Sequence, residues 1–357
     1  MESMVASGEI FKGRNILITG HTGFKGSWLA LWLHKLGARI TGIALDPVNP
    51  MDAFNAMRIS DISADHRQDI NDFQGLLSHM RKARPEIVFH LAAQPLVLES
   101  YNDPLYTFNT NITGTANVLE ACRQAGSVKV IIVITTDKVY ENRGSGEAFT
   151  ESDRLGGDDP YSASKAAAEI VTGAYRASFL RAMDMATATA RAGNVIGGGD
   201  WAGNRIIPDC VRALTAGIPV EIRNPAAVRP WQYVLEPLGG YLLLAGKMLE
   251  RTKEFNEAWN FGPDYEGNKT VEEVVNEFIR DWGEGSIINS TKKSVFHEAE
   301  LLSLNTDKAR IRLGWRPLLS FEESVKMTAE WYKAQNDGKN MRNFSLDQIK
   351  HYEELMS

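Results

Sequence analysis

The chain has 357 residues, of which 43% are hydrophobic and 24% are charged, and its formal net charge is −6. Its length predicts about two domains, and the absence of a basic balance argues against a nucleic-acid-binding protein. The two cysteines and seven histidines lack the spacing of metal ligands, so no metal site is expected. No apolar run reaches the roughly 20 residues that span a bilayer, and no signal-peptide core is recognisable, which predicts a cytoplasmic protein.

The first predicted elements are an apolar strand, a glycine-rich turn and an amphipathic helix. The strand covers residues 15–19 and the helix covers about residues 27–36. Glycines with this spacing between a strand and a helix allow close approach of the backbone to a pyrophosphate, which the helix N-terminus attracts. The second strand, residues 39–45, ends at Asp46, whose carboxylate can accept ribose hydroxyls and disfavours a 2′-phosphate. These elements predict a site for NAD rather than NADP, and its candidate residues in the turn are Gly20, Thr22, Gly23, Phe24, Lys25 and Gly26.

Two further strands are expected to complete this cofactor site. One precedes Asp69, which either contacts the adenine edge or caps the helix of residues 73–80, and the sequence leaves both interpretations open. The other covers residues 86–91 and ends in small residues, which let a flat cofactor pass closely or serve packing alone. The cofactor candidates here are Asp69, Ile70, Leu91, Ala92 and Ala93, and Gln94 is a substrate candidate.

A fifth strand, residues 128–134, ends in Thr135-Thr136-Asp137-Lys138, and a helix that starts near Tyr161 carries Lys165 four residues later. Residues four apart share one helix face, and an ammonium beside a phenol favours the phenolate and lowers its pKa. Tyr161 can then take the proton of an alcohol as hydride leaves for a nicotinamide, while Thr136 orients the same oxygen. Thr135 is assigned to the cofactor.

The adjacent Asp137 and Lys138 add an acid and a base that a plain alcohol dehydrogenase does not need. Oxidation of an alcohol acidifies the carbon beside the new ketone. A base that takes this proton and an acid that assists loss of a hydroxyl together perform β-elimination. The alternative is that Asp137 caps a turn and Lys138 is a solvated charge.

Strands that alternate with helices predict an α/β fold with a doubly wound parallel sheet of the Rossmann type. From about residue 195 the elements become shorter and arginines more frequent, which predicts a smaller α/β substrate lobe. We expect a cofactor domain over residues 1–193, with 230–260 returning to it, a substrate lobe over 194–229 and 261–336, and a tail over 337–357.

Arginines in the second lobe suit a bound diphosphate, because guanidinium groups match phosphate oxygens. Arg223 and Arg229 are the best candidates, and an ordinary surface ion pair is the alternative for any one arginine. Aromatic residues there either line a base or sugar pocket or belong to the core. The full set of substrate candidates in this half is Asn194, Trp201, Arg205, Arg223, Arg229, Trp231, Tyr233, His297 and Glu298.

The glycine turn, the Tyr161/Lys165 pair and the Thr-Asp-Lys triplet resemble those of extended short-chain dehydrogenases that act on nucleotide sugars. The resemblance covers nearly the whole chain. The segments 191–201 and 223–237 resemble the branch that dehydrates CDP-glucose, and Lys138 stands where dTDP-glucose and GDP-mannose dehydratases carry glutamate. One departure is Leu98-Glu99, which replaces an arginine usual in these relatives.

The resemblance implies a lyase that performs NAD-dependent 4,6-dehydration of a nucleoside diphosphate hexose, CDP-glucose above all. It implies oxidation at carbon 4 by Tyr161, with Lys165 also on the nicotinamide ribose. Asp137 would protonate the leaving 6-hydroxyl and Lys138 would take the carbon-5 proton, while Asn194 and the two arginines would hold the diphosphate. It also implies a role in deoxysugar biosynthesis and a homodimer or homotetramer formed through helices of the first domain. The alternatives are a 4-epimerase or dehydrogenase, or a dehydratase of another nucleotide sugar.

Overall fold

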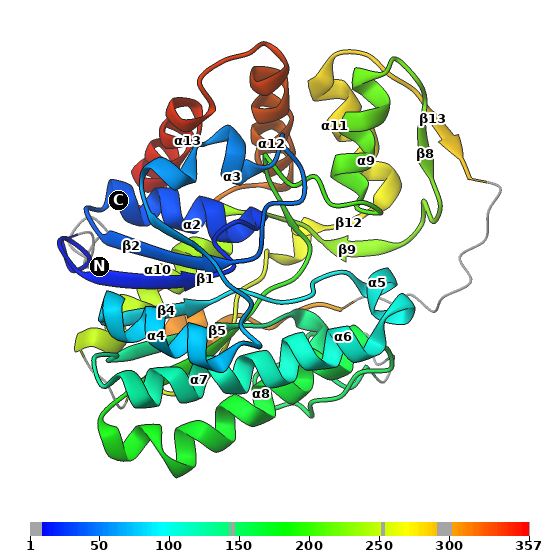
Figure 1. Cartoon of the computed structure of the whole chain (residues 1–357). Helices are drawn as coiled ribbons and strands as arrows, with labels where there is room; N and C mark the ends of the chain where they lie inside the picture. The colour runs from blue at the N-terminus through cyan, green and yellow to red at the C-terminus, as the bar shows by residue number, and fades with distance from the viewer. Residues whose placement is uncertain (1–8, 143, 145–146, 251–253, 291–301, 357) are drawn as a thin grey trace.

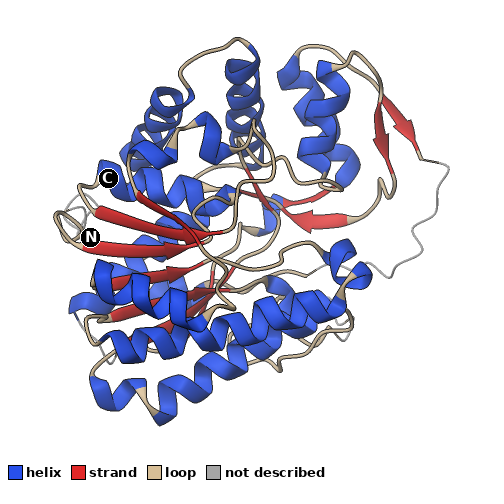
Figure 2. Cartoon of the chain, in the orientation of Figure 1, coloured by secondary structure: helices blue, strands red, loops and turns tan. Residues whose placement is uncertain are grey.

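The structure is a computed structural model, and it describes residues 9–142, 144, 147–250, 254–290 and 302–356. Its centre is a seven-stranded sheet in the order β11-β6-β5-β4-β1-β2-β3, in which every pair of neighbours is parallel (Figure 2). This arrangement confirms the predicted α/β fold. The strands are β1 Asn15–Thr19, β2 Arg39–Ala44, β3 Ala64–Arg67, β4 Ile87–His90, β5 Val130–Ile134, β6 Ala186–Arg191 and β11 Ala258–Asn260.

Helices cover both faces of this sheet (Figure 1). The three on one face are α4 Phe73–Ala83, α7 Gly114–Ala125 and α8 Pro160–Ser178, and those on the other are α2 Phe24–Lys35 and α10 Leu235–Glu250. Two further helices, α12 Phe321–Asn336 and α13 Met341–Met356, pack against each other, and α13 packs against α2. Side chains of a strand alternate between the two faces, so β5 sends Ile131 and Val133 into one apolar cluster and Ile132 and Ile134 into the other. The central strand β5 is therefore apolar throughout and buried on both faces.

The second half of the chain adds three small two-stranded sheets beside the carboxyl edge of the main sheet. Their strands are β7 Val195–Ile196 with β10 Gln232–Tyr233, β8 Val220–Ile222 with β13 Ile287–Asn289, and β9 Val228–Pro230 with β12 Asn268–Thr270. The remaining helices are α3 Ala53–Ala56, α5 Val97–Asn102, α6 Pro104–Phe108, α9 Ile206–Thr215 and α11 Val271–Trp282. After the first of these small sheets, the chain returns to the main sheet, where β11 pairs with β6.

Within the described ranges, no helix combines the length and apolar character needed to cross a membrane.

Candidate active site

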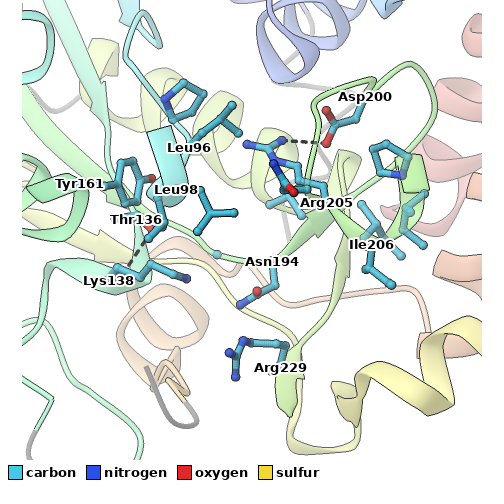
Figure 3. A pocket seen from close by; sticks show the side chains of 18 of the residues that line it. Leu96, Leu98, Thr136, Lys138, Tyr161, Asn194, Asp200, Arg205, Ile206 and Arg229 are labelled. Carbon is cyan, nitrogen blue, oxygen red and sulfur yellow. Dashed lines mark hydrogen bonds and ion pairs between the residues drawn. The ribbon is translucent and has the colours of Figure 1, made fainter. Parts of the chain in front are cut away.

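A cavity of about 480 Å³ lies where the carboxyl ends of the central strands face the small sheets. Chemistry in open α/β folds gathers at this edge. Figure 3 shows that the cavity brings residues of the first half, such as Tyr161, Thr136 and Lys138, opposite residues of the second half, such as Arg205 and Arg229. The sequence-predicted residues that line it are Phe24, Lys25, Thr135, Thr136, Asp137, Lys138, Tyr161, Asn194, Arg205, Arg223, Arg229 and Trp231.

Tyr161 reaches the cavity because α8 starts one residue before it. Asp159 caps this helix by accepting a hydrogen bond from the backbone N–H of Ser162 at 2.9 Å, and Pro160 occupies the first turn. The phenol is hydrogen-bonded to Thr136. Burial nevertheless raises the pKa of Tyr161 to about 12, although the Thr136 hydrogen bond and the charge of Arg205 act in the opposite direction.

Lys165 lies one helical turn further along α8, and its ammonium donates to the backbone oxygen of Ile134 at 3.2 Å. Burial lowers the pKa of Lys165 to about 7, and the positive charge of Lys25 lowers it further, whereas Glu169 raises it. The expectation that Lys165 lowers the pKa of Tyr161 therefore does not hold here, because burial outweighs the attraction of nearby charges. Among the cationic side chains, Arg205 is the one that favours the phenolate.

Asp137 lies at the base of the cavity and is fully buried. One carboxylate oxygen accepts from Thr136 Oγ1 at 2.8 Å and from Lys138 Nζ at 3.4 Å, and the other accepts from Asn194 Nδ2 at 3.2 Å. A Cβ atom on Gly193 would collide with this carboxylate, so only glycine fits there. The local turn is capped by Thr136, not by Asp137. Both Asp137 and Lys138 line the cavity, which argues against a purely local role.

The glycine-rich turn between β1 and α2 is closely packed and has the geometry expected of a pyrophosphate cradle. Gly20 has φ +79°, and a Cβ atom there would lie 2.7 Å from the backbone nitrogen of Ala92. A Cβ atom on Gly26 would collide with the carbonyl oxygen of Gly20. Gly23 is the N-cap of α2 and offers no side-chain hydrogen bond, and the first turn carries no acidic residue. The amide end of α2 is thus suited to an anion, and these residues fit a dinucleotide.

The predicted ribose and adenine contacts lie at the neighbouring strand ends. Asp46 is exposed and pairs with Arg67 Nε at 3.0 Å. Asp69 accepts from the backbone N–H of Asn71 at 2.8 Å, whereas α4 is capped by Asp72. The capping role considered for Asp69 therefore belongs to Asp72.

The other cofactor candidates are placed as follows. Thr22 Oγ1 donates to Leu45 O at 3.0 Å and ties the turn to β2. Ile70 is buried against α7, since a Cβ atom on Gly114 would lie 2.5 Å from its Cδ1 atom. Leu91, Ala92 and Ala93 follow β4 and are half-buried.

Several substrate candidates do not line the cavity. The Gln94 side chain donates to Thr107 Oγ1 at 2.8 Å and to Leu96 O at 3.0 Å, which holds the loop before α5. Trp201 packs edge-on against Tyr332, with ring centroids 5.5 Å apart. Tyr233 is fully buried and donates to Gln348 Oε1 at 2.7 Å. His297 and Glu298 lie outside the described residues.

A buried ion pair beneath the cavity was not predicted from the sequence. Glu169 of α8 and Arg191 of β6 form two hydrogen bonds, at 2.9 and 3.0 Å, with 4% of each side chain exposed. Glu169 also accepts from Thr135 Oγ1 and Thr189 Oγ1, both at 2.6 Å. Arg191 donates to the hydroxyl of Tyr140 at 2.7 Å. The sequence gives one indication of this ion pair, which is that Glu169 follows Lys165 by four residues and therefore shares its helix face.

Leucines of the segment that departs from the family pattern also reach the cavity. Leu96 and Leu98 point into it between Tyr161 and Arg205 (Figure 3). Leu98, where the sequence departs from the expected pattern, thus forms part of the cavity wall.

The fold is that of the epimerases and dehydratases among the short-chain dehydrogenases. The chain belongs to the GDP-mannose 4,6 dehydratase family, whose sequence model matches residues 17–328. It is 43% identical over 347 residues to CDP-glucose 4,6-dehydratase of Salmonella typhimurium, which covers 96% of this chain and 97% of the relative. It is 27% identical over 359 residues to dTDP-glucose 4,6-dehydratase of the same organism, which covers 91% and 94%.

Solved structures agree in fold. UDP-glucose 4-epimerase of Thermotoga maritima with UDP-glucose superposes with a TM-score of 0.79 at 24% identity and covers 90% of this chain and 99% of that one. DesIV, a dTDP-glucose 4,6-dehydratase from Streptomyces venezuelae with NAD and TYD bound, has a TM-score of 0.78 at 24% identity and covers 91% and 98%. At this identity the likeness shows the fold alone.

Proposed function

We propose that the chain is an NAD-dependent CDP-glucose 4,6-dehydratase, which converts CDP-glucose to CDP-4-keto-6-deoxy-glucose and water. The observation that carries the proposal is the placement of Asp137 and Lys138 in one cavity with the hydrogen-bonded pair Tyr161 and Thr136. The 43% identity to CDP-glucose 4,6-dehydratase supports the choice of substrate.

The side chains divide the proton transfers among them. Tyr161 takes the proton of the 4-hydroxyl, while Thr136 holds the same oxygen. Lys138 takes the carbon-5 proton, Asp137 gives a proton to the departing 6-hydroxyl, and Lys138 later returns its proton to carbon 5. When bound, NAD would supply the hydride chemistry at carbons 4 and 6, and together with these proton transfers the net change is the loss of one water.

The remaining residues bind and orient. Arg223 and Arg229 lie on the second-lobe side of the cavity and hold the diphosphate through charge-assisted hydrogen bonds. Asn194 fixes the Asp137 carboxylate, which it contacts at 3.2 Å. The glycine turn and Asp46 hold the pyrophosphate and the adenosine ribose of NAD.

Assembly into a homo-oligomer through helices of the first domain belongs to the same proposal. Helices of the first domain expose large apolar side chains. Leu105 on α6 is 79% exposed, Ile170 on α8 is 62% exposed, and Phe179 just after α8 is 48% exposed. Contact between copies would remove this surface from water.

The experiment is to incubate the purified protein and NAD with glucose linked to CDP, UDP, dTDP or GDP. The 4-keto-6-deoxy product is detected by its absorbance in alkali. We expect product to form fastest from CDP-glucose, and we expect Tyr161→Phe to lower kcat by about 100- to 10,000-fold, the usual contribution of general acid–base catalysis. Absence of product from all four sugars would sink the proposal. Net release of NADH, or a carbon-4 epimer formed without loss of water, would identify a dehydrogenase or an epimerase instead.

A further inference from the structure

Part of the cavity lining comes from β8 and the residues that follow it. Val220 and Ile222 of β8 are buried in the core, whereas Glu221 between them is exposed. Because side chains alternate along a strand, Glu221 and Arg223 share the face opposite to the core. Both residues line the cavity, as does Asn224. A carboxylate therefore stands beside one of the two arginines that we assign to the diphosphate.

The other acidic side chains that line the cavity have partners of their own. Asp137 binds Thr136, Lys138 and Asn194. The remaining pairs are Asp159 with Ser162, Asp200 with Arg205, Asp209 with Arg212, and Glu99 with Asn102. Within the described ranges, the side chain of Glu221 has no hydrogen bond or ion pair.

An unpaired carboxylate beside a diphosphate site weakens anion binding, because like charges repel. Its presence is favourable only where it accepts hydrogen bonds from a neutral part of the ligand. The 4-amino group of cytosine is such a donor, whereas uracil and thymine present a carbonyl oxygen at the same position. Carboxylates recognise this amino group in protein–nucleic acid contacts. Two acceptors that face each other leave both groups without a hydrogen bond, which is costly in a binding site.

We infer that Glu221 reads the nucleobase, by accepting a hydrogen bond from the 4-amino group of cytosine and by rejecting the carbonyl group of uracil or thymine. The inference rests on the proposed function, because it takes the substrate to be a nucleoside diphosphate sugar whose diphosphate lies at Arg223 and Arg229. It adds a specificity-determining residue on β8, two residues before Arg223.

The test measures dissociation constants of CDP and UDP for the full-length protein with NAD, by titration calorimetry. The wild type is expected to bind CDP about 10- to 100-fold more tightly than UDP, the discrimination typical of one well-placed base contact. Glu221→Gln should bring the two constants within about 3-fold of each other, because an amide both donates and accepts and thus serves either base. Glu221→Asp keeps the acceptor and should still prefer CDP.

The matched control is Glu272→Gln, which removes one charge from an exposed residue of the same lobe at the start of α11. It should keep the wild-type ratio. A Glu221→Gln variant with an unchanged ratio, or a wild type without preference for CDP, would overturn the assignment of Glu221. Turnover of CDP-glucose by the wild type is measured separately, so a failure of this assignment is distinguished from a failure of the proposed reaction.

Discussion

At the scale of single residues, the environment of Tyr161 differs most from what its neighbours in sequence suggest. Burial raises its pKa to about 12, and burial together with Lys25 lowers the pKa of Lys165 to about 7. Burial thus favours the neutral form of the Tyr161 phenol and weakens the preference of Lys165 for its charged form. The proposed catalysis by Tyr161 would therefore rely on positive charges near the phenol, and in the described structure Arg205 acts in this direction.

The role of Lys138 is tested by Lys138→Ala. Because Lys138 is not part of the glycine-rich turn or of the strand ends assigned to NAD, this variant should bind NAD with unchanged affinity. It should also still oxidise carbon 4, which relies on Tyr161. Dehydration should fall about 100-fold or more, since the base at carbon 5 is lost. The measurements are NAD titration by fluorescence, transient formation of NADH, and the keto-sugar assay. Dehydration at the wild-type rate would refute Lys138 as the base.

At the scale of elements, α8 couples the chemistry to the frame of the sheet. One face of α8 carries Tyr161, Lys165 and Glu169 at four-residue intervals. Glu169 accepts hydrogen bonds from Thr135, which follows β5, and from Arg191 of β6. The strand ends that carry Thr136 and Asn194 are adjacent to these anchors. The ion pair thus holds α8, which carries Tyr161, in place against the strand ends that carry Thr136 and Asn194.

Arg191→Met should lower the free energy of unfolding by about 3–5 kcal/mol, because it leaves the Glu169 carboxylate buried without its charged partner. The double variant Glu169→Gln/Arg191→Met removes both charges and should recover most of that loss. Urea unfolding followed by circular dichroism measures both values. If the single variant were as stable as the double variant, the ion pair would contribute only through packing.

At the scale of the whole molecule, the C-terminal helix is tied to the core by one buried carboxyl group. Glu236 of α10 accepts from Tyr352 of α13 at 2.7 Å and from the backbone N–H groups of Leu318 and Leu319 at 2.9 and 2.7 Å. Burial raises the pKa of Glu236 to about 7, although these donors act in the opposite direction. In addition, Trp32 of α2 packs edge-on against Tyr352.

This raised pKa predicts a specific pH dependence of stability. Between pH 4.5 and about 7 the folded state holds a proton on Glu236 that the unfolded chain has lost, so the contribution of this group to stability falls as the pH rises through that window. Glu236→Gln keeps the acceptor for both N–H groups and removes the charge. It should raise the free energy of unfolding at pH 8 by up to about 3 kcal/mol and have little effect near pH 4.5. Urea unfolding at the two pH values checks this, and a variant less stable than the wild type at pH 8 would contradict it.

Much of the fold and the core of the site was predictable because their signals are local. The spacing of the glycines predicts the turn, and the runs of apolar residues predict the strands. Asp137 and Lys138 come shortly after one of these strands. Which of the aromatic substrate candidates line the cavity was not predictable from the sequence. Trp231 lines the cavity, whereas Trp201 and Tyr233 pack elsewhere. Whether one aromatic ring faces a cavity or the core depends on residues distant in sequence, such as Tyr332 and Gln348.

The sequence by itself determined the parallel α/β fold, the strand–turn–helix of the cofactor site and the position of Tyr161 relative to Lys165, since each depends on residues within a few positions of one another. Only the tertiary structure decided the electrostatics and the walls of the cavity. Arg205 acts on Tyr161, Leu98 enters the cavity, and Glu221 is without a side-chain partner among the described residues. Burial and charge are properties of the packed molecule, because they depend on everything within several ångströms of a group and not on its neighbours along the chain.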